Sequence, residues 1–208
     1  MKPQDEYWNI DPNSGAVLQA LIHAQKPKNI LEVGTSNGYS AILMGNVASL
    51  YGGNITTIEF FDERVKLAKE NIATEGLSET IEVIQGDAVE IMSQLAVSSR
   101  PPSRDPGAWI PGPADAKAMA GKQARNDNLN KQPPSFDFIF LDANKEEYAL
   151  YFQYAMQIIT PHGIIIADNT LSHAKKLTEF FTVVQKEPRA HAIRLAIGTG
   201  LMMISVYP

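Results

Sequence analysis

The stretch that decides the fold reads Phe138-Ile-Phe-Leu-Asp142-Ala-Asn-Lys145, and a similar one downstream reads Ile164-Ile-Ile-Ala-Asp168-Asn169. Each is a short apolar run that ends in oxygen-bearing side chains, which is typical of a buried strand in a parallel sheet. Open α/β sheets bind ligands outside the carboxyl ends of such strands. We therefore expect both strand ends to contribute to one site at the same edge of a sheet.

The residues at these two strand ends suggest a metal site. Asp142, Asp168 and Asn169 offer three hard oxygen ligands, which suit Mg²⁺, with Ca²⁺ or Mn²⁺ as alternatives, rather than zinc. Lys145 follows Asp142 closely enough to act on a substrate held by the metal. A single aspartate at a strand end is more commonly a cap or turn residue. The prediction therefore depends on two such strand ends occurring together.

The composition narrows the class of protein. The chain has 208 residues, which suits one domain with a core that needs no disulfide or structural metal. The absence of cysteine excludes disulfides, thiolate zinc sites and cysteine nucleophiles. The net charge of −5 argues against a surface built as a whole for nucleic acid. Because there is no secretory pattern and no apolar run of about 18 residues, we expect a cytoplasmic protein without a membrane span.

Short apolar segments alternate with amphipathic ones along the chain, which predicts an α/β fold with a parallel sheet. Asp11 before Pro12 predicts the start of a first helix, and Asp62 and Gly76 are expected to cap and end a later one. The other expected helices cover residues 40–50, 88–96, 146–159 and 172–185. The expected strands cover residues 29–33, 54–59, 80–85, 136–141, 163–167, 190–195 and 201–207.

The segment Ser98–Ser135 does not fit this alternation. It holds 7 of the chain's 13 prolines, and its six basic and three acidic residues give it a net charge of +3. We interpret it as a Pro-rich, basic insertion within a single domain. The sequence leaves open whether it is a tolerated surface insertion, a lid over the active site or a basic arm for a polyanionic substrate.

A glycine-containing turn follows the first expected strand in Leu31-Glu32-Val-Gly34-Thr-Ser-Asn-Gly38-Tyr-Ser40. Glycines let the backbone approach a ligand, and a helix N-terminus offers N–H groups to an anion. The spacing fits neither the dinucleotide fingerprint nor the P-loop. The remaining pattern, acidic-x-Gly-x-x-x-Gly, is similar to the first motif of S-adenosylmethionine (SAM)-dependent methyltransferases. The alternative is a glycine turn needed only for packing.

Two further strand ends carry acidic residues. Glu59 ends the second expected strand, where an acidic side chain can accept both hydroxyls of a ribose. Taken alone, Glu59 is better explained as a cap or surface acid near Asp62. Gly86-Asp87-Ala88 ends the third strand, where an adenine could rest against the backbone and Asp87. The three strand ends together favour a SAM site.

With these segments in place, the chain resembles the cation-dependent O-methyltransferase family, which includes catechol O-methyltransferase and caffeoyl-CoA O-methyltransferases. The resemblance covers roughly residues 8–96 and 136–207. Its most specific part is the pair Asp142-Ala-Asn-Lys145 and Asp168-Asn169, together with the spacing between them. The matching segments are 32–40, 58–59, 86–88, 136–148, 165–171 and 195–201.

The resemblance implies a Rossmann-like, doubly wound, seven-stranded SAM-dependent methyltransferase fold with the last strand antiparallel. It implies a divalent cation bound by Asp142, Asp168 and Asn169, with Lys145 as general base. It also implies SAM contacts, with Asp142 bordering the cofactor: Glu32, Gly34 and Ser40 at the amino-acid end, Glu59 at the ribose, and Asp87 and Ala88 at the adenine. Asn144 stands where many members have aspartate. A homodimer is a further expectation from the resemblance.

We therefore predict a metal-dependent O-methyltransferase that acts on a small aromatic acceptor with two adjacent hydroxyls, a catechol. Some bacterial relatives methylate a hydroxylated uridine in tRNA, and contact between the basic insertion and the RNA backbone is a second possibility. A non-catalytic SAM-binding protein that docks through the insertion is a third, because fold alone does not decide function. His173 either faces the acceptor or lies in the first turn of the helix expected after Ser172.

Overall fold

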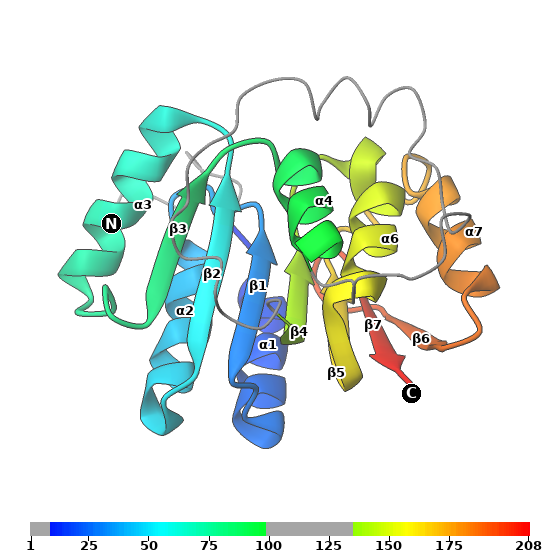
Figure 1. The fold of residues 1–208 in the computed structure, drawn as a ribbon, viewed down its shortest axis with the longest axis horizontal. Helices are drawn as coiled ribbons and strands as arrows, with labels where there is room; N and C mark the ends of the chain where they lie inside the picture. Colours follow the sequence, from blue (N-terminus) through cyan, green and yellow to red (C-terminus); the bar gives the residue numbers. More distant parts are fainter. Residues whose placement is uncertain (1–8, 99–134) are drawn as a thin grey trace.

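The computed structural model describes residues 9–98 and 135–208, which form a seven-stranded sheet in the order β3-β2-β1-β4-β5-β7-β6 (Figure 1). Strands β1 to β5 are parallel, and β7 runs antiparallel to both of its neighbours. This confirms the predicted doubly wound sheet with its last strand antiparallel. The strands are β1 Asn29–Val33, β2 Asn54–Glu59, β3 Ile81–Gln85, β4 Phe136–Leu141, β5 Ile159–Ala167, β6 Ala190–Leu195 and β7 Leu201–Val206.

Helices cover both faces of the sheet. Helices α1, α2 and α3 lie on one face, and α4, α6 and α7 lie on the other (Figure 1). Their bounds are α1 Pro12–Gln25, α2 Tyr39–Ala48, α3 Asp62–Thr74, α4 Ala88–Ser98, α6 Tyr148–Ile158 and α7 Thr178–Lys186, with short 3-10 turns η2 Ser49–Tyr51 and η3 Lys145–Glu147. Because both faces are covered, the C-terminal halves of β4 and β5 carry apolar side chains on both faces. In β4, Phe138 and Phe140 pack toward α1–α3, whereas Ile139 and Leu141 pack toward α4, α6 and α7.

The strand order places a topological switch point between β1 and β4. The chain proceeds from β1 outward to β2 and β3, then returns to the other side of β1 to form β4. At such a point the loops that follow the two central strands leave in opposite directions, which opens a crevice for ligands at the carboxyl edge. The loop after β1 contains Gly34, and the loop after β4 begins with Asp142, so both predicted motifs meet there.

Several boundaries differ from the sequence predictions for local reasons. The helix expected from Ser172 begins at Thr178, because residues 170–177 form successive turns, in which Ala174 N–H bonds to the carbonyl of Leu171 and Lys176 N–H to that of His173. Asp62 is the first residue of α3 and not its cap. The cap position is Phe61, and Asp62 instead forms an ion pair with Lys66 at 2.6 Å.

Two other predictions, on the insertion and on a membrane span, can be compared with the structure only over the described residues. The insertion predicted at 98–135 lies outside the described residues except for its two ends. Within residues 9–98 and 135–208, no helix has the length and apolar character needed to cross a membrane.

Candidate functional site

The two predicted aspartates lie side by side at the carboxyl edge of the sheet. Asp142 N–H donates to the carbonyl of Val33 at 2.9 Å, and Asp168 N–H donates to the carbonyl of Leu141 at 3.0 Å. These bonds extend the parallel ladder β1–β4–β5 one residue beyond the strands. The backbone therefore fixes Asp142 beside the end of β1 and Asp168 beside the end of β4, as the sequence predicted.

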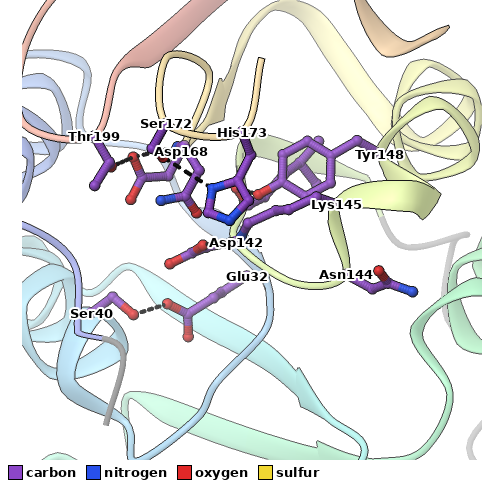
Figure 2. A network of polar contacts seen from close by, with 12 residues as sticks. Glu32, Ser40, Asp142, Asn144, Lys145, Tyr148, Asp168, Ser172, His173 and Thr199 are labelled. Carbon is purple, nitrogen blue, oxygen red and sulfur yellow. Dashed lines mark hydrogen bonds and ion pairs between the residues drawn. The ribbon is translucent and has the colours of Figure 1, made fainter. Parts of the chain in front are cut away.

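Lys145 turns back toward Asp142. Its Nζ donates to Asp142 Oδ1 at 2.7 Å, and only 16% of each side chain is exposed (Figure 2). The turn η3 makes this possible, since the Asn144 side chain accepts the N–H of Glu146 and starts the turn at Lys145. Nζ also lies 5.2 Å from the ring centre of Tyr148, whose hydroxyl donates to the carbonyl of Leu141 at 3.0 Å. A buried ring thus supports the lysine that the sequence predicted as the base.

The Asp168 carboxylate is buried, with 1% of the residue exposed. Burial, followed by the negative charge of Asp142, raises the pKa of Asp168 from 3.8 to about 6. The Thr199 hydroxyl and the Asn169 N–H both donate to Asp168 Oδ1, each at 2.6 Å, and they act in the opposite direction on the pKa.

These residues fit a divalent cation. Two carboxylates that repel each other would gain from a cation between them, and the amide of Asn169 adds a neutral oxygen. Asn169 adopts a left-handed backbone conformation, with φ of 62°, which asparagine tolerates better than most residues. Among the described residues, no group of three histidine, aspartate or glutamate side chains converges to hold a metal, so the predicted set needs its amide ligand.

Gly34 is required by the switch point itself. Its φ is +105°, and a Cβ at this position would lie 2.3 Å from the backbone oxygen of Asp142. Gly38 also has a positive φ, and a Cβ there would sit at ordinary contact distance, 3.4 Å, from Ala68 of α3. Backbone conformation and packing therefore account for both glycines without a ligand. The turn brings the β1 and β4 loops together whether or not it also holds SAM.

Glu32 and Ser40, predicted at the amino-acid end of SAM, contact each other. Glu32 is fully buried, and its two carboxyl oxygens accept hydrogen bonds from the Ser40 and Thr57 hydroxyls, with Ser40 Oγ at 2.5 Å. Thr57 is bonded in turn to Thr35 at 2.6 Å. Burial raises the pKa of Glu32 and the two hydroxyls lower it. The effect of burial is the larger, and the pKa is raised to about 8. The side chain of Glu32 therefore joins β1, β2 and α2 from inside the protein.

The other two predicted cofactor carboxylates also have partners within the protein. Glu59 accepts the N–H of Ser36 at 2.8 Å and that of Phe61 at 3.0 Å, one on each oxygen. An ionised carboxylate has about four acceptor positions, so Glu59 can still accept a ribose hydroxyl. Asp87 is exposed and accepts the N–H of Glu90 at 3.0 Å, directly before Ala88 begins α4.

A model of the O-methyltransferase family matches residues 2–106 and 114–205. The chain belongs to the O-methyltransferase family. A Niastella koreensis relative named catechol O-methyltransferase is 33% identical over 82% of this chain and 62% of its own length. An Aspergillus flavus relative named O-methyltransferase imqG is 34% identical over 73% of this chain and 49% of its own length. This chain thus spans about half to three fifths of these two relatives.

Among solved structures, an O-methyltransferase from Bacillus cereus in complex with SAH matches with a TM-score of 0.73 and 26% identity. The match covers 95% of this chain and 82% of that one. The fold is thus that of an O-methyltransferase, as the resemblance implied.

Three residues near the site were not predicted from sequence. Thr57 supports Glu32, Tyr148 supports Lys145, and Thr199 bonds to Asp168. Tyr148 stands three residues after Lys145, a spacing that brings side chains together on a helical turn, so this contact could have been anticipated. Thr199 lies 31 residues from Asp168, and no sequence pattern links them.

Proposed function

We propose that this protein transfers a methyl group from SAM to one hydroxyl of a small catechol-type acceptor and that the reaction depends on a divalent cation. The observation that carries the proposal is the convergence of Asp142, Asp168 and Lys145 at the switch point beside the Gly34 turn. The name of the Niastella relative supports a catechol, and the SAH bound to the Bacillus cereus protein supports the cofactor.

Asp142, Asp168 and Asn169 are the residues that would hold the cation, Mg²⁺ in the first place. When bound there, a divalent cation supplies Lewis-acid polarisation and orients two adjacent hydroxyl oxygens. Asp142 holds Lys145 Nζ at this position, and Lys145 in its neutral form accepts the proton of the reacting hydroxyl at Nζ. The burial of Asp168 limits the water that reaches the charged groups, which strengthens interactions among them.

On the cofactor side, Glu32, Gly34 and Ser40 would position the amino-acid end of SAM. Glu59 would accept the ribose hydroxyls, and Asp87 with Ala88 would border the adenine. Asp142 borders both halves, because its backbone lies against Gly34 and its side chain against Lys145. Methyl transfer is an in-line displacement, and such alignment contributes about 7–11 kcal/mol to lowering the barrier. The rigid row of strand ends is suited to that alignment.

The test is methyl transfer from isotopically labelled SAM to a panel of catechols, with Mg²⁺ and then with EDTA. We expect transfer to one hydroxyl of a catechol, loss of activity with EDTA and recovery when Mg²⁺ is restored. Equal activity with EDTA would contradict metal dependence. SAM binding without transfer to any catechol would contradict the acceptor class and favour the tRNA substrate or the non-catalytic binder.

We also propose that the protein is a homodimer, as the family resemblance implies. Light scattering of the purified chain is expected to give twice the mass of 22.8 kDa. A monomer mass at micromolar concentration would contradict this.

A further inference from the structure

The turn between β6 and β7 supports the segment that carries Asp168 and Asn169. The carbonyl of Gly200 accepts the N–H of Thr170 at 2.9 Å. The carbonyl of Thr199 accepts the N–H groups of Leu171 and Ser172 at 3.1 and 3.0 Å. Three successive N–H groups after Asn169 are thus bonded to this one turn. The position of this turn therefore determines the path of the chain just after β5.

The same turn is packed on its other side against the start of α1. A Cβ at Gly198 would lie 2.6 Å from both Asp11 Oδ1 and Ser14 Oγ. Asp11 is the N-cap of α1, and Ser14 Oγ bonds to the carbonyl of Ile197 at 3.5 Å. Because neighbours fill the space on both sides, the turn has little freedom to shift. A side chain on it can therefore hold another group in a fixed orientation.

Thr199 is the only residue of the Gly198-Thr199-Gly200 turn with a side chain, and it points at Asp168 (Figure 2). Its hydroxyl donates to Asp168 Oδ1, the oxygen that also accepts the Asn169 N–H. Within the part of the chain that the structure describes, no hydrogen bond to Asp168 Oδ2 is present. Figure 2 shows the carboxylate lying between Thr199 and Asp142. Both protein donors thus bond to one oxygen and leave the other available for a ligand.

We propose that Thr199 is a positioning residue that orients the Asp168 carboxylate so that Oδ2 is presented to the divalent cation. The terminal torsion of an aspartate is broad, so without a donor on Oδ1 the carboxylate would sample orientations that do not present Oδ2. Hydrogen-bond partners behind a metal ligand typically change metal affinity 10–100-fold. The inference rests on the proposed function, since it concerns the same cation.

The test is a titration of the EDTA-treated full chain with Mn²⁺, followed by electron paramagnetic resonance, which reports free Mn²⁺ directly and needs no turnover. Thr199→Val keeps the shape of the side chain but removes the donor, and we expect Mn²⁺ affinity to fall about 10–100-fold. Thr199→Ser restores the donor and is expected to stay within about threefold of the wild type. Thr182→Val is the matched control, because that hydroxyl bonds to the carbonyl of Thr178 within α7, away from the proposed cation site. SAH affinity, measured by calorimetry, should be the same in all four proteins.

Three outcomes would overturn the inference while leaving the proposed function in place. In the first, Thr199→Val binds Mn²⁺ as the wild type does. In the second, Thr199→Ser loses as much affinity as Thr199→Val, so the hydroxyl is not the cause. In the third, SAH affinity falls in parallel, which would indicate a general disturbance of the site. A wild-type protein that binds no Mn²⁺ would instead contradict the proposed metal dependence and, with it, the inference.

Discussion

Glu32 and Asp168 are both buried carboxyl groups near the carboxyl edge of the sheet, yet their surroundings differ. Two hydroxyls donate to Glu32, one to each oxygen. Two donors also reach Asp168, but both bond to the same oxygen. Burial alone therefore does not distinguish a carboxyl group that stabilises the fold from one that is available to a ligand. What distinguishes them is whether the hydrogen-bond donors are shared between both carboxyl oxygens or bond to one.

The comparison extends to charge. The pKa of Glu32 is raised to about 8 by burial, so Glu32 is largely protonated at neutral pH. The pKa of Asp168 is raised to about 6, so Asp168 is largely ionised there. The fold thus keeps the internal carboxyl neutral and keeps the carboxylate of the proposed cation site charged. The following predictions test this division, from the largest expected effect to the smallest.

Asp168→Asn should separate activity from stability. Because the amide removes the anionic ligand, we expect the metal-dependent rate to fall about 10³-fold, equivalent to about 4 kcal/mol of barrier. Because it also removes a buried charge that repels Asp142, the free energy of unfolding without metal should stay the same or rise. Rate measurements and urea unfolding of the same preparation check both. A variant that loses activity because it is unfolded would contradict the prediction.

Lys145→Met should lower kcat about 10²-fold, since it removes the proposed proton acceptor and keeps the apolar stem. SAM affinity, measured by calorimetry, should stay within about twofold, because the contacts of Lys145 are with Asp142 Oδ1 and the ring of Tyr148. Lys176→Met is the control. That lysine is exposed and pairs with Glu146 at 3.3 Å, so its loss should leave kcat unchanged. Equal losses of turnover and SAM affinity in Lys145→Met would point to a structural role.

Gly34→Ala should destabilise the fold by more than about 3 kcal/mol, because its methyl group would collide with the backbone of Asp142. Gly52 offers a matched comparison. It too has a positive φ, of +73°, but a Cβ there would have no neighbour within 4 Å. Gly52→Ala should therefore cost only the conformational strain, about 1 kcal/mol. Urea unfolding measures both, and similar losses would show that the approach of the two loops does not constrain Gly34.

Glu32→Gln should have the smallest effect below about pH 4.5, within about 1 kcal/mol, because the native glutamate is protonated there in both the folded and the unfolded states. Its influence should appear in the pH dependence. The folded protein holds this proton up to about pH 8, whereas the unfolded chain releases it near 4.5. The stabilisation is therefore complete below pH 4.5 and is lost as the pH rises toward 8, with a slope of up to about 1.4 kcal/mol per pH unit.

Unfolding free energies of Glu32→Gln between pH 6 and 8 should lack that slope. Identical slopes in the variant and the wild type would show that Glu32 is ionised in the folded protein.

The sequence predicted the strands that carry the site because their apolar runs end at polar residues. β1, β2 and β4 have the bounds expected for them, whereas β5 ends at Ala167 as expected but begins at Ile159 and not at Gly163. Asp142 and Asp168 lie together at the predicted edge. Turns held by distant partners were not predictable. The residues after Asn169 have a helix-like composition, but residues 170–177 form turns, and the first three of their N–H groups bond to Gly200 and Thr199. Local propensity cannot anticipate a partner that lies so far along the chain.

The sequence also could not predict which protein groups bond to the carboxyl groups expected at the SAM site. The motif around Glu32 is the same whether its side chain meets a ligand or the hydroxyls of Ser40 and Thr57. Which of these holds depends on how β1, β2 and α2 pack, and Thr57 lies 25 residues away. Likewise, the glycine pattern could not show that Gly34 is needed to pass the backbone of Asp142. The roles of these residues toward SAM therefore stay predictions.

The central claim is that Asp142 and Asp168 form a cation site needed for methyl transfer. The most direct test is a single-turnover measurement with labelled SAM and a catechol on EDTA-treated protein, titrated back with Mg²⁺, in the wild type and in Asp142→Asn. We predict that the rate of the wild type rises with Mg²⁺ to saturation, while Asp142→Asn binds SAH but gains little rate at any concentration. A wild-type rate that does not depend on Mg²⁺, or equal recovery by Asp142→Asn, would contradict the claim.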